Sequence, residues 1–359
     1  MTEAKVSVSE VQEGMKTSKD VISQEGIFLM PKDTVISKNH ILKLQLYQMS
    51  HITIYETPLE PIFVTLKESK TEDVIVSQTK EFKDFSTKYL SGVNAIEREF
   101  SNMVQKGSVD SKSLSSIVDT FIHETSNNQL FSYLCRIQSK DDATFSHSMN
   151  VSILATILGK WLHLDDHSIM NLSIAGLLHD IGKTQIDPKI LNKKGKLTPD
   201  EFEYIKTHTT LGYKIIADAP LDDGIKQAVL MHHEKMNGSG YPLHLSWEKI
   251  HMYAKIIAIV DIYDAITSDR PYHNRFHPFT AIRVLEEECY GVLETDYLYV
   301  FLENIAHNFL GNDVLLSTGE EAKIIFINPQ SPSHPMVQTK SSKFIDLLSY
   351  DFITIDKFI

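Results

Sequence analysis

The sequence has few cysteines and no long apolar run, and each absence excludes a class of protein. Among 359 residues there are only two cysteines, Cys135 and Cys289. This excludes a disulfide scaffold and a cysteine-rich zinc or iron–sulfur site. No apolar stretch approaches the roughly 18 residues that a membrane-spanning helix needs, and no apolar segment follows the first residues as it would in a signal peptide. We therefore expect a cytoplasmic protein without membrane insertion.

Positive charge is also in short supply. The chain has 35 lysines and arginines against 47 aspartates and glutamates, a net charge of −12. Binding to a nucleic-acid polymer depends on an excess of basic residues, so we expect no such partner. Histidine, in contrast, is concentrated: 13 of the 16 histidines lie between His123 and His307. This concentration directs the search for metal chemistry to that part of the chain.

Hydrophobic patterning divides the chain into segments of different character. Short alternating or β-branched runs predict strands over residues 6–11, 27–30 and 51–55, with a short helix over 38–48. Helical spacing dominates from residue 111 to 311, and strand-like runs return after it. The fold class predicted is mainly α, with small β-rich segments at the N-terminal and C-terminal ends.

A continuous apolar seam predicts one long helix before the main helical segment. Its members recur three or four residues apart, the spacing of one helix face, and Gly107 ends the helix. They are Phe82, Phe85, Tyr89, Val93, Ile96, Phe100 and Met103. The seam either packs on its own domain or forms a homodimer, because its spacing is close to the 3.5-residue repeat of paired helices.

Histidines and aspartates in the helical segment form a candidate metal site. They are His147, His179, Asp180, His208, His232, His233 and Asp261. Each one alone is typical of a satisfied core residue or a solvated surface residue, but a carboxylate such as Asp261, between apolar residues, needs a partner or a metal. Asp264, one turn later, is a candidate partner or cap. Five imidazoles and two carboxylates without a thiolate suit two ions of Fe, Mn or Zn, and not Cu(I). Such a pair lowers the pKa of a bridging water and holds a phosphoryl oxygen.

Four motifs occur in order along this segment. They are HDIGK at 179–183, KGKLT at 194–198, HHE at 232–234 followed by NGSGYP at 237–242, and DIYDAITSDRPY at 261–272. With these motifs the sequence resembles HD-GYP domains, a branch of the HD phosphohydrolases. The resemblance covers about residues 128–310 and implies an all-helical HD-type phosphohydrolase domain. We place a β-rich accessory domain at 1–66, a helical linker at 67–127, the HD-GYP domain at 128–311 and a β-rich extension at 312–359.

The resemblance implies an activity and a role for each residue of the site. Proteins of this family hydrolyse cyclic di-GMP to the linear dinucleotide pGpG, and some cut it further to GMP. The seven candidates correspond to the ligands of two divalent ions, Fe or Mn, with Asp180 bridging and a metal-bridged hydroxide as nucleophile. Lys183 corresponds to a lysine that bonds the phosphate. The remaining substrate contacts implied are Gly240, Tyr241, Arg270, His273 and Arg275.

The sequence departs from the family pattern at three positions. Ala143 stands where some members have a glutamate that helps to hold a third metal, so we expect two metals. Asn237 replaces the usual aspartate, and we interpret it as a turn residue. His273 replaces a lysine or arginine, which weakens the hold on the substrate phosphate unless Arg275 compensates.

Other functions stay open on the sequence. An HD phosphohydrolase could act on another cyclic dinucleotide, and a receptor could bind cyclic di-GMP without hydrolysis. The receptor without hydrolysis is disfavoured, because a ligand residue stands at all seven metal-ligand positions. The N-terminal segment could also be an interaction module that docks a partner.

Overall fold

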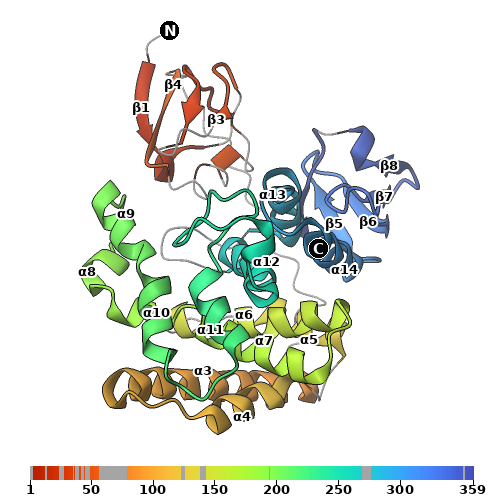
Figure 1. Ribbon diagram of the computed structural model, residues 1–359. Helices are drawn as coiled ribbons and strands as arrows, with labels where there is room; N and C mark the ends of the chain where they lie inside the picture. Colours follow the sequence, from red (N-terminus) through yellow and green to blue (C-terminus); the bar gives the residue numbers. More distant parts are fainter. Residues whose placement is uncertain are drawn as a thin grey trace. The chain divides into compact units, whose positions relative to one another are not determined.

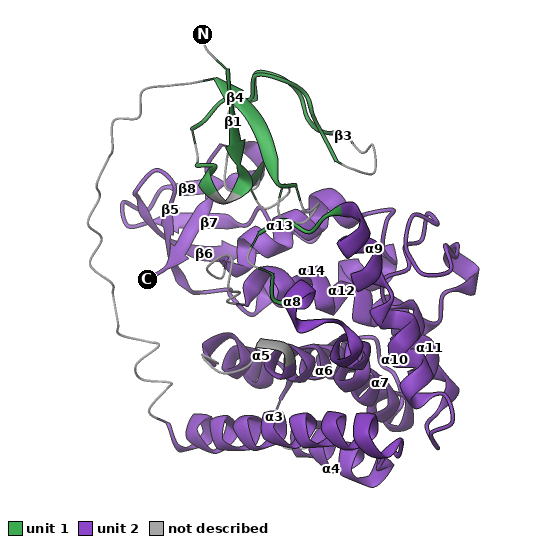
Figure 2. Ribbon diagram, turned by 90° about the vertical axis from the view of Figure 1, so that its left-hand side faces the viewer, with its two compact units in different colours: residues 1–69, 192–198, 271–273 green, residues 70–191, 199–270, 274–359 purple. Residues whose placement is uncertain are grey.

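The computed structural model of the chain divides into two compact units, which are coloured separately in Figure 2. Unit 1 comprises residues 1–69, 192–198 and 271–273, and unit 2 comprises residues 70–191, 199–270 and 274–359. The residues described are 3–12, 14–23, 28–34, 36, 40–41, 44, 49–55, 79–122, 126–137, 143–193, 195–268, 276–350 and 352–359.

Unit 1 contains two short antiparallel strand pairs. Strand β1 (Glu3–Ser7) pairs with β4 (His51–Tyr55), and β2 (Val21–Ile22) pairs with β3 (Phe28–Met30). The strand predicted over 6–11 is wrong beyond residue 7, because residues Val8–Glu10 form a 3-10 turn, η1. Val8 still contributes to the apolar core of the unit. The helix predicted over 38–48 lies largely outside the described residues.

Unit 2 is built mainly from helices, as the patterning predicted (Figure 1). The helices are α3 (Lys80–Lys106), α4 (Ser111–Ile122), α5 (Asn127–Arg136), α6 (Ala143–Trp161), α7 (Asp166–Leu178), α8 (Pro188–Leu191), α9 (Pro199–Lys206), α10 (His208–Ile216), α11 (Asp223–Met231), α12 (Met252–Thr267), α13 (Pro278–Cys289) and α14 (Thr295–His307). The 3-10 helices η2 (Ile181–Gln185) and η3 (Trp247–Lys249) lie between them. Among the described residues, no helix is both long and apolar enough to cross a membrane.

Helices α6, α7 and α12 form the buried centre of unit 2. Helix α6 packs against both α7 and α12, and α11 packs against α7 and α12. Residues on every side of α7 and α12 are buried, including Leu172, Leu177, Ile257 and Val260. A helix that is apolar all round is stable only in such a position. The centre of unit 2 therefore holds polar side chains such as His147 and Asp264 away from water.

Helix α3 has a cap at each end and a buried seam between them. The Thr79 side chain accepts a hydrogen bond from the Phe82 backbone, and Gly107 ends the helix with φ 63° and donates to the Met103 carbonyl. Both devices satisfy backbone groups that a helix end leaves unpaired. The seam packs against α4 and α6, as one of the two interpretations of its spacing predicted. This packing buries the seam, and a homodimer through this helix stays a prediction.

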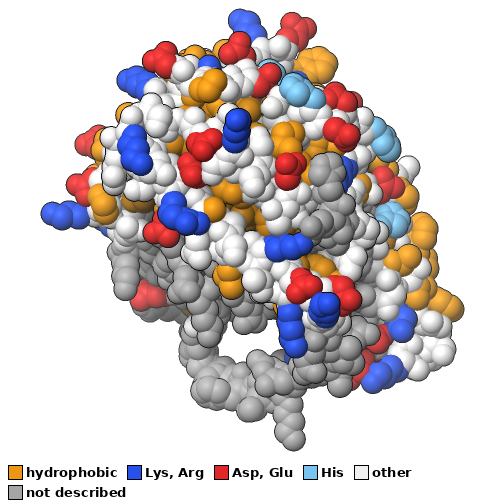
Figure 3. Space-filling view, turned by 90° about the horizontal axis from the view of Figure 1, so that it is seen from below, with side chains coloured by type: hydrophobic (Ala, Val, Ile, Leu, Met, Phe, Trp, Pro, Cys, Tyr) orange, Lys and Arg blue, Asp and Glu red, His pale blue; other side chains and the backbone are white. Residues whose placement is uncertain are grey.

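The face seen from below in Figure 3, where α3 and α4 lie, carries charged side chains of both signs with scattered apolar ones between them.

The C-terminal part of unit 2 is a five-stranded antiparallel sheet in the order β8-β7-β6-β5-β9. Its strands are β5 (Asp313–Leu316), β6 (Glu321–Phe326), β7 (Met336–Thr339), β8 (Phe344–Asp346) and β9 (Ile355–Phe358), and the turn η4 is Leu347–Ser349. The sheet confirms a β-rich C-terminal segment. The boundaries at 66, 127 and 311 remain a prediction.

Candidate metal centre

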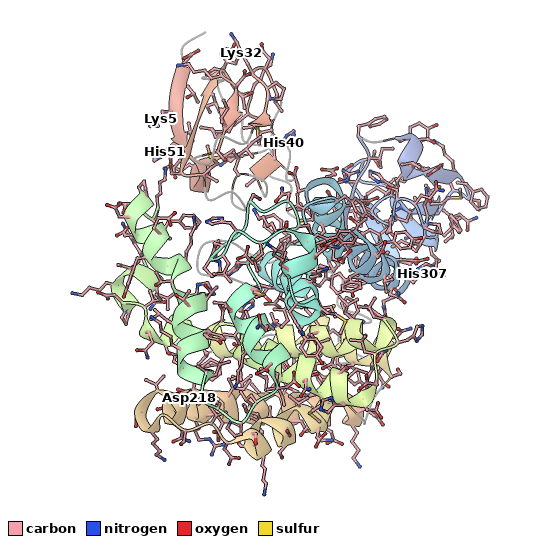
Figure 4. All side chains as sticks on the ribbon, in the orientation of Figure 1. Lys5, Lys32, His40, His51, Asp218 and His307 are labelled. Atoms are coloured by element: carbon pink, nitrogen blue, oxygen red, sulfur yellow. The ribbon has the colours of Figure 1, made fainter. Side chains whose placement is uncertain are left out.

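The seven predicted ligand residues come together in unit 2. Helix α6 carries His147, α10 begins at His208, and α12 carries Asp261. His179 and Asp180 directly follow α7, and His232 and His233 directly follow α11. The structure thus brings together side chains that are up to 114 residues apart in sequence. Not every histidine is involved, since His307, labelled in Figure 4, is exposed at the end of α14.

The carboxylate of Asp180 lies between two groups of histidines. Its Oδ2 atom is 3.2 Å from His179 Nε2 and 3.5 Å from His147 Nε2. Its Oδ1 atom is 3.4 Å from His208 Nε2 and 3.9 Å from His232 Nε2. One oxygen therefore faces each group, which is the arrangement that a carboxylate bridging two metal ions requires.

Each group contains three side chains whose ligand atoms lie within 4.8 Å of one another. The first consists of His147, His179 and Asp261, and the second of His208, His232 and His233. In the first group, His147 Nε2 lies 3.0 Å from Asp261 Oδ1. Nitrogen and oxygen donors in this number suit two ions of Fe, Mn or Zn type.

The imidazoles are oriented by hydrogen bonds from their Nδ1 atoms. Three of them bond the backbone carbonyl three residues earlier: His179 to Gly176 at 2.8 Å, His208 to Ile205 at 2.8 Å, and His232 to Val229 at 3.0 Å. A carbonyl only accepts, so Nδ1 carries the proton and Nε2 keeps a free lone pair. His147 differs, because its Nδ1 bonds the Asp264 carboxylate at 2.7 Å. In all four rings Nε2 is the atom left for a metal.

The protonation states suit metal binding. Burial lowers the pKa of His208 to about 4 and that of His233 to about 3, and it holds the pKa of His232 well below its usual range. These three imidazoles are therefore neutral near pH 7. Burial opposes ionisation of Asp180, but the positive charge of Lys183, together with the contacts of Asp180 with His179 and His208, outweighs this effect and holds the pKa of that carboxyl well below its usual range. The centre combines an ionised carboxylate with neutral imidazoles.

Two buried atoms of the centre have no hydrogen-bond partner among the described residues. They are His179 Nε2 and Asp180 Oδ1, and both side chains are almost wholly buried. A buried polar atom without a partner costs about 1–3 kcal/mol. Divalent ions between the two groups would satisfy both atoms, so the residues present fit a pair of metals.

Gly182 allows the two halves of the centre to meet. It lies in η2, which packs against α10. A Cβ atom at this position would lie 1.8 Å from the His208 carbonyl oxygen and 2.5 Å from the Gly212 nitrogen. Both are backbone atoms that a side-chain rotation does not move. The close approach that only glycine permits here places Asp180 beside His208.

The loop that carries Gly240 and Tyr241 closes over the second histidine group. A Cβ atom on Gly240 would lie 2.3 Å from the Lys235 nitrogen, so the loop returns tightly onto the end of α11. The Tyr241 ring lies 4.8 Å from the His233 ring at 30°, and 6.4 Å from the His208 ring. Tyr241 is thereby placed at the centre, where the sequence predicted a substrate contact.

Two residues near this loop were given no role in the sequence prediction. Glu234 is buried and accepts hydrogen bonds from the backbone nitrogens of Leu243 at 2.6 Å and Leu245 at 2.9 Å. Lys206 places its ammonium 5.5 Å from the centre of the Tyr241 ring. Its position two residues before His208 was the only signal of a role for Lys206.

The predicted substrate contacts are described only in part. The Lys183 ammonium lies 2.5 Å from Asp180 Oδ2 and is partly exposed, so it adjoins both the centre and solvent. Arg270, His273 and Arg275 lie outside the described residues. Asn237 accepts hydrogen bonds from the backbone and hydroxyl of Ser239, as a turn residue does.

The helical segment that carries these residues is similar to known proteins. Residues 131–290 match a family described as HD domain. A cyclic di-GMP phosphodiesterase of Pseudomonas aeruginosa is 34% identical over 206 residues, which cover 57% of this chain and 50% of that protein. A cyclic di-GMP phosphodiesterase of Thermotoga maritima is 34% identical over 166 residues, covering 46% and 45%. A 3′3′-cGAMP-specific phosphodiesterase of Vibrio cholerae is 32% identical over 170 residues, covering 47% and 39%. The chain spans about half the length, or less, of these curated relatives.

A solved structure shares the fold. It is an HDGYP protein from Bdellovibrio bacteriovorus, with a TM-score of 0.50 and 16% identity, and the match covers 84% of this chain and 98% of that one. Residues 131–290 of the helical segment are thus similar to the HD domain family. The predicted resemblance to HD-GYP domains is confirmed as a resemblance by the family match and these relatives.

Proposed function

We propose that this protein is a metal-dependent phosphodiesterase that opens cyclic di-GMP to pGpG, with a second cut to GMP left open. One observation carries the proposal: the Asp180 carboxylate directs one oxygen toward each of two histidine groups. The curated relatives from Pseudomonas aeruginosa and Thermotoga maritima, which are named as cyclic di-GMP phosphodiesterases, support the substrate.

The ligand residues divide between two ions, for which we propose Fe(II) or Mn(II). His147, His179, Asp261 and Asp180 Oδ2 would hold one, and His208, His232, His233 and Asp180 Oδ1 the other. Two such ions supply Lewis acidity to a phosphoryl group and lower the pKa of water. Because Ala143 stands in place of a glutamate, we propose two ions and not three.

Protein groups around the centre would bind and orient the dinucleotide. Lys183 has three N–H donors and is partly exposed, so it can donate to a phosphate oxygen while it remains beside Asp180. Charge that develops on that phosphate is stabilised by such a donor. Tyr241 offers a ring face for a guanine base, and Lys206 adds a positive charge next to that ring. We propose Gly240, Arg270, His273 and Arg275 as further substrate contacts.

Hydrolysis of cyclic di-GMP by anaerobically purified protein tests the proposal. The full chain is loaded with Fe(II) or Mn(II), and products are separated by chromatography. The wild type should form pGpG or GMP, and Asp180→Ala should form neither. Asp218→Ala is the matched control, because Asp218 is exposed at the end of α10 (Figure 4). Normal turnover by Asp180→Ala would contradict the proposal.

A related substrate is the second candidate. Relatives from Vibrio cholerae are named 3′3′-cGAMP-specific phosphodiesterases, at 29% and 32% identity. The same assay with 3′3′-cGAMP separates the two substrates. Bound metal with no product from either dinucleotide would favour a receptor that binds without hydrolysis.

A further inference from the structure

A buried line of hydrogen bonds runs from helix α3 to the candidate metal centre. The Tyr89 hydroxyl donates to Asn150 Oδ1 at 2.6 Å. The Asn150 amide nitrogen donates to Asp264 Oδ1 at 2.8 Å, and Asp264 Oδ2 lies 2.7 Å from His147 Nδ1. Ser268 also donates to Asp264 Oδ1, at 2.8 Å. Three helices, α3, α6 and α12, contribute to the line.

The donors and acceptors along this line fix the state of His147. The Asn150 amide uses its oxygen for Tyr89 and its nitrogen for Asp264, so it has one orientation that satisfies both. The Asp264 carboxylate accepts from Asn150, and it can accept the Nδ1 proton of His147. This leaves the lone pair on His147 Nε2, which lies 3.0 Å from Asp261 Oδ1 in the first metal group.

His147 depends on distant side chains more than the other three rings do. His179, His208 and His232 each bond a carbonyl three residues earlier in their own segment. Their orientation is therefore set locally. The Nδ1 atom of His147 instead bonds a side chain 117 residues away, on α12. That side chain is held in turn by a residue of α6 that contacts α3.

The Tyr89 hydroxyl is not needed to fill space in the seam. Tyr89 is completely buried, and neighbouring seam positions hold phenylalanine, at Phe82, Phe85 and Phe100. A buried hydroxyl is costly without a partner, so a phenylalanine would fill this position more simply. The phenol stays protonated, because burial raises the pKa of Tyr89 well above its usual range. The hydroxyl is thus a permanent donor aimed at Asn150.

We propose that Tyr89 is a positioning residue for the metal centre, which acts through Asn150 and Asp264 to hold His147 in its ligating orientation. Tyr89 lies on α3, outside residues 131–290 that match the HD domain family. The helix that precedes the domain therefore supports metal binding within it. This inference rests on the proposed metal centre.

The test compares Tyr89→Phe with Tyr133→Phe in the full chain. Tyr133 is the matched control, because it is also buried and its hydroxyl accepts one hydrogen bond, from Gln129 at 2.7 Å. Mn(II) affinity is measured by competition with a chelator. Changing a residue that orients a metal ligand typically weakens metal binding about 10–100-fold. We expect a loss in this range for one of two ions in Tyr89→Phe, and no loss in Tyr133→Phe.

Two further readouts separate positioning from simple stability. The melting temperature of the metal-free protein should fall in both variants, since each loses the hydrogen bonding of its hydroxyl; the Tyr89 hydroxyl also lies 3.2 Å from the Ser146 carbonyl oxygen. Asn150→Ala should weaken Mn(II) binding as Tyr89→Phe does, and the double variant should be no weaker than Asn150→Ala, because both act along one line.

Wild-type Mn(II) affinity in Tyr89→Phe would overturn the inference, and so would equal losses in the two tyrosine variants. Failure of the wild type to bind Mn(II) would instead remove the proposed centre itself. The two failures are therefore distinguishable.

Discussion

Replacing Gly182 by alanine tests how closely the two halves of the centre must approach. The new Cβ atom would lie 1.8 Å from the His208 carbonyl oxygen. A carbon–oxygen contact needs about 3.3 Å, so η2 and α10 must separate by about 1.5 Å. The 3.4 Å gap between His208 Nε2 and Asp180 Oδ1 would widen by a similar amount. A carboxylate displaced so far can no longer serve both histidine groups.

The expected effect is selective for one ion. Displacing a functional group by about 1 Å can lower activity about 100-fold. We expect a loss of similar size in the affinity of the His208 group for its ion, about 100-fold. Overpacking of this kind also lowers the free energy of unfolding by about 1–3 kcal/mol. Mn(II) titration and thermal unfolding measure the two effects. Gln185→Ala, at an exposed position of η2, is the control. Two ions bound to Gly182→Ala with wild-type affinity would refute the reasoning.

Two further predictions concern the loop and the pH dependence of stability. Glu234→Gln should lower the free energy of unfolding by about 2 kcal/mol and reduce kcat/KM, because a carboxylate that accepts two backbone hydrogen bonds is lost. The control is Glu203→Gln, at an exposed position. Equal stability and activity of the two variants would contradict the role given to Glu234. For the metal-free protein, burial lowers the pKa of His208 from 6.5 to about 4. The unfolded chain therefore binds the extra proton first as the pH falls. As the pH falls from 6.5 to 4, the free energy of unfolding should drop by up to about 1.4 kcal/mol per pH unit because of this residue. A free energy of unfolding in urea that stays constant over this window would contradict the prediction.

Periodicity in the sequence was sufficient to predict the helical architecture. The seam from Phe82 to Met103 predicted α3, because one helix face is buried along its whole length. The strand predicted over 6–11 failed at Val8, whose apolar side chain is buried from a 3-10 turn and not from a strand. Alternation of apolar residues reports which side chains are buried, but it does not report the backbone conformation that buries them.

The sequence named the side chains that the structure brings together, but not the contacts that hold them in place. Adjacent His179 and Asp180 are visible as a pair in the sequence, and the motifs around them indicated their partners. The hydrogen bond from Tyr89 to Asn150 joins residues 61 positions apart, and a tyrosine in an apolar seam looks like any other buried aromatic residue. Only the three-dimensional arrangement shows where its hydroxyl points.

Electron paramagnetic resonance of the Mn(II)-loaded protein tests the central claim, that Asp180 joins two adjacent metal sites. We predict two Mn(II) ions per chain whose spectrum is that of an exchange-coupled pair, and loss of the coupling in Asp180→Ala. Asp218→Ala should keep the coupled spectrum. A single ion per chain, a third ion, or two ions with the spectrum of isolated Mn(II) would contradict the account.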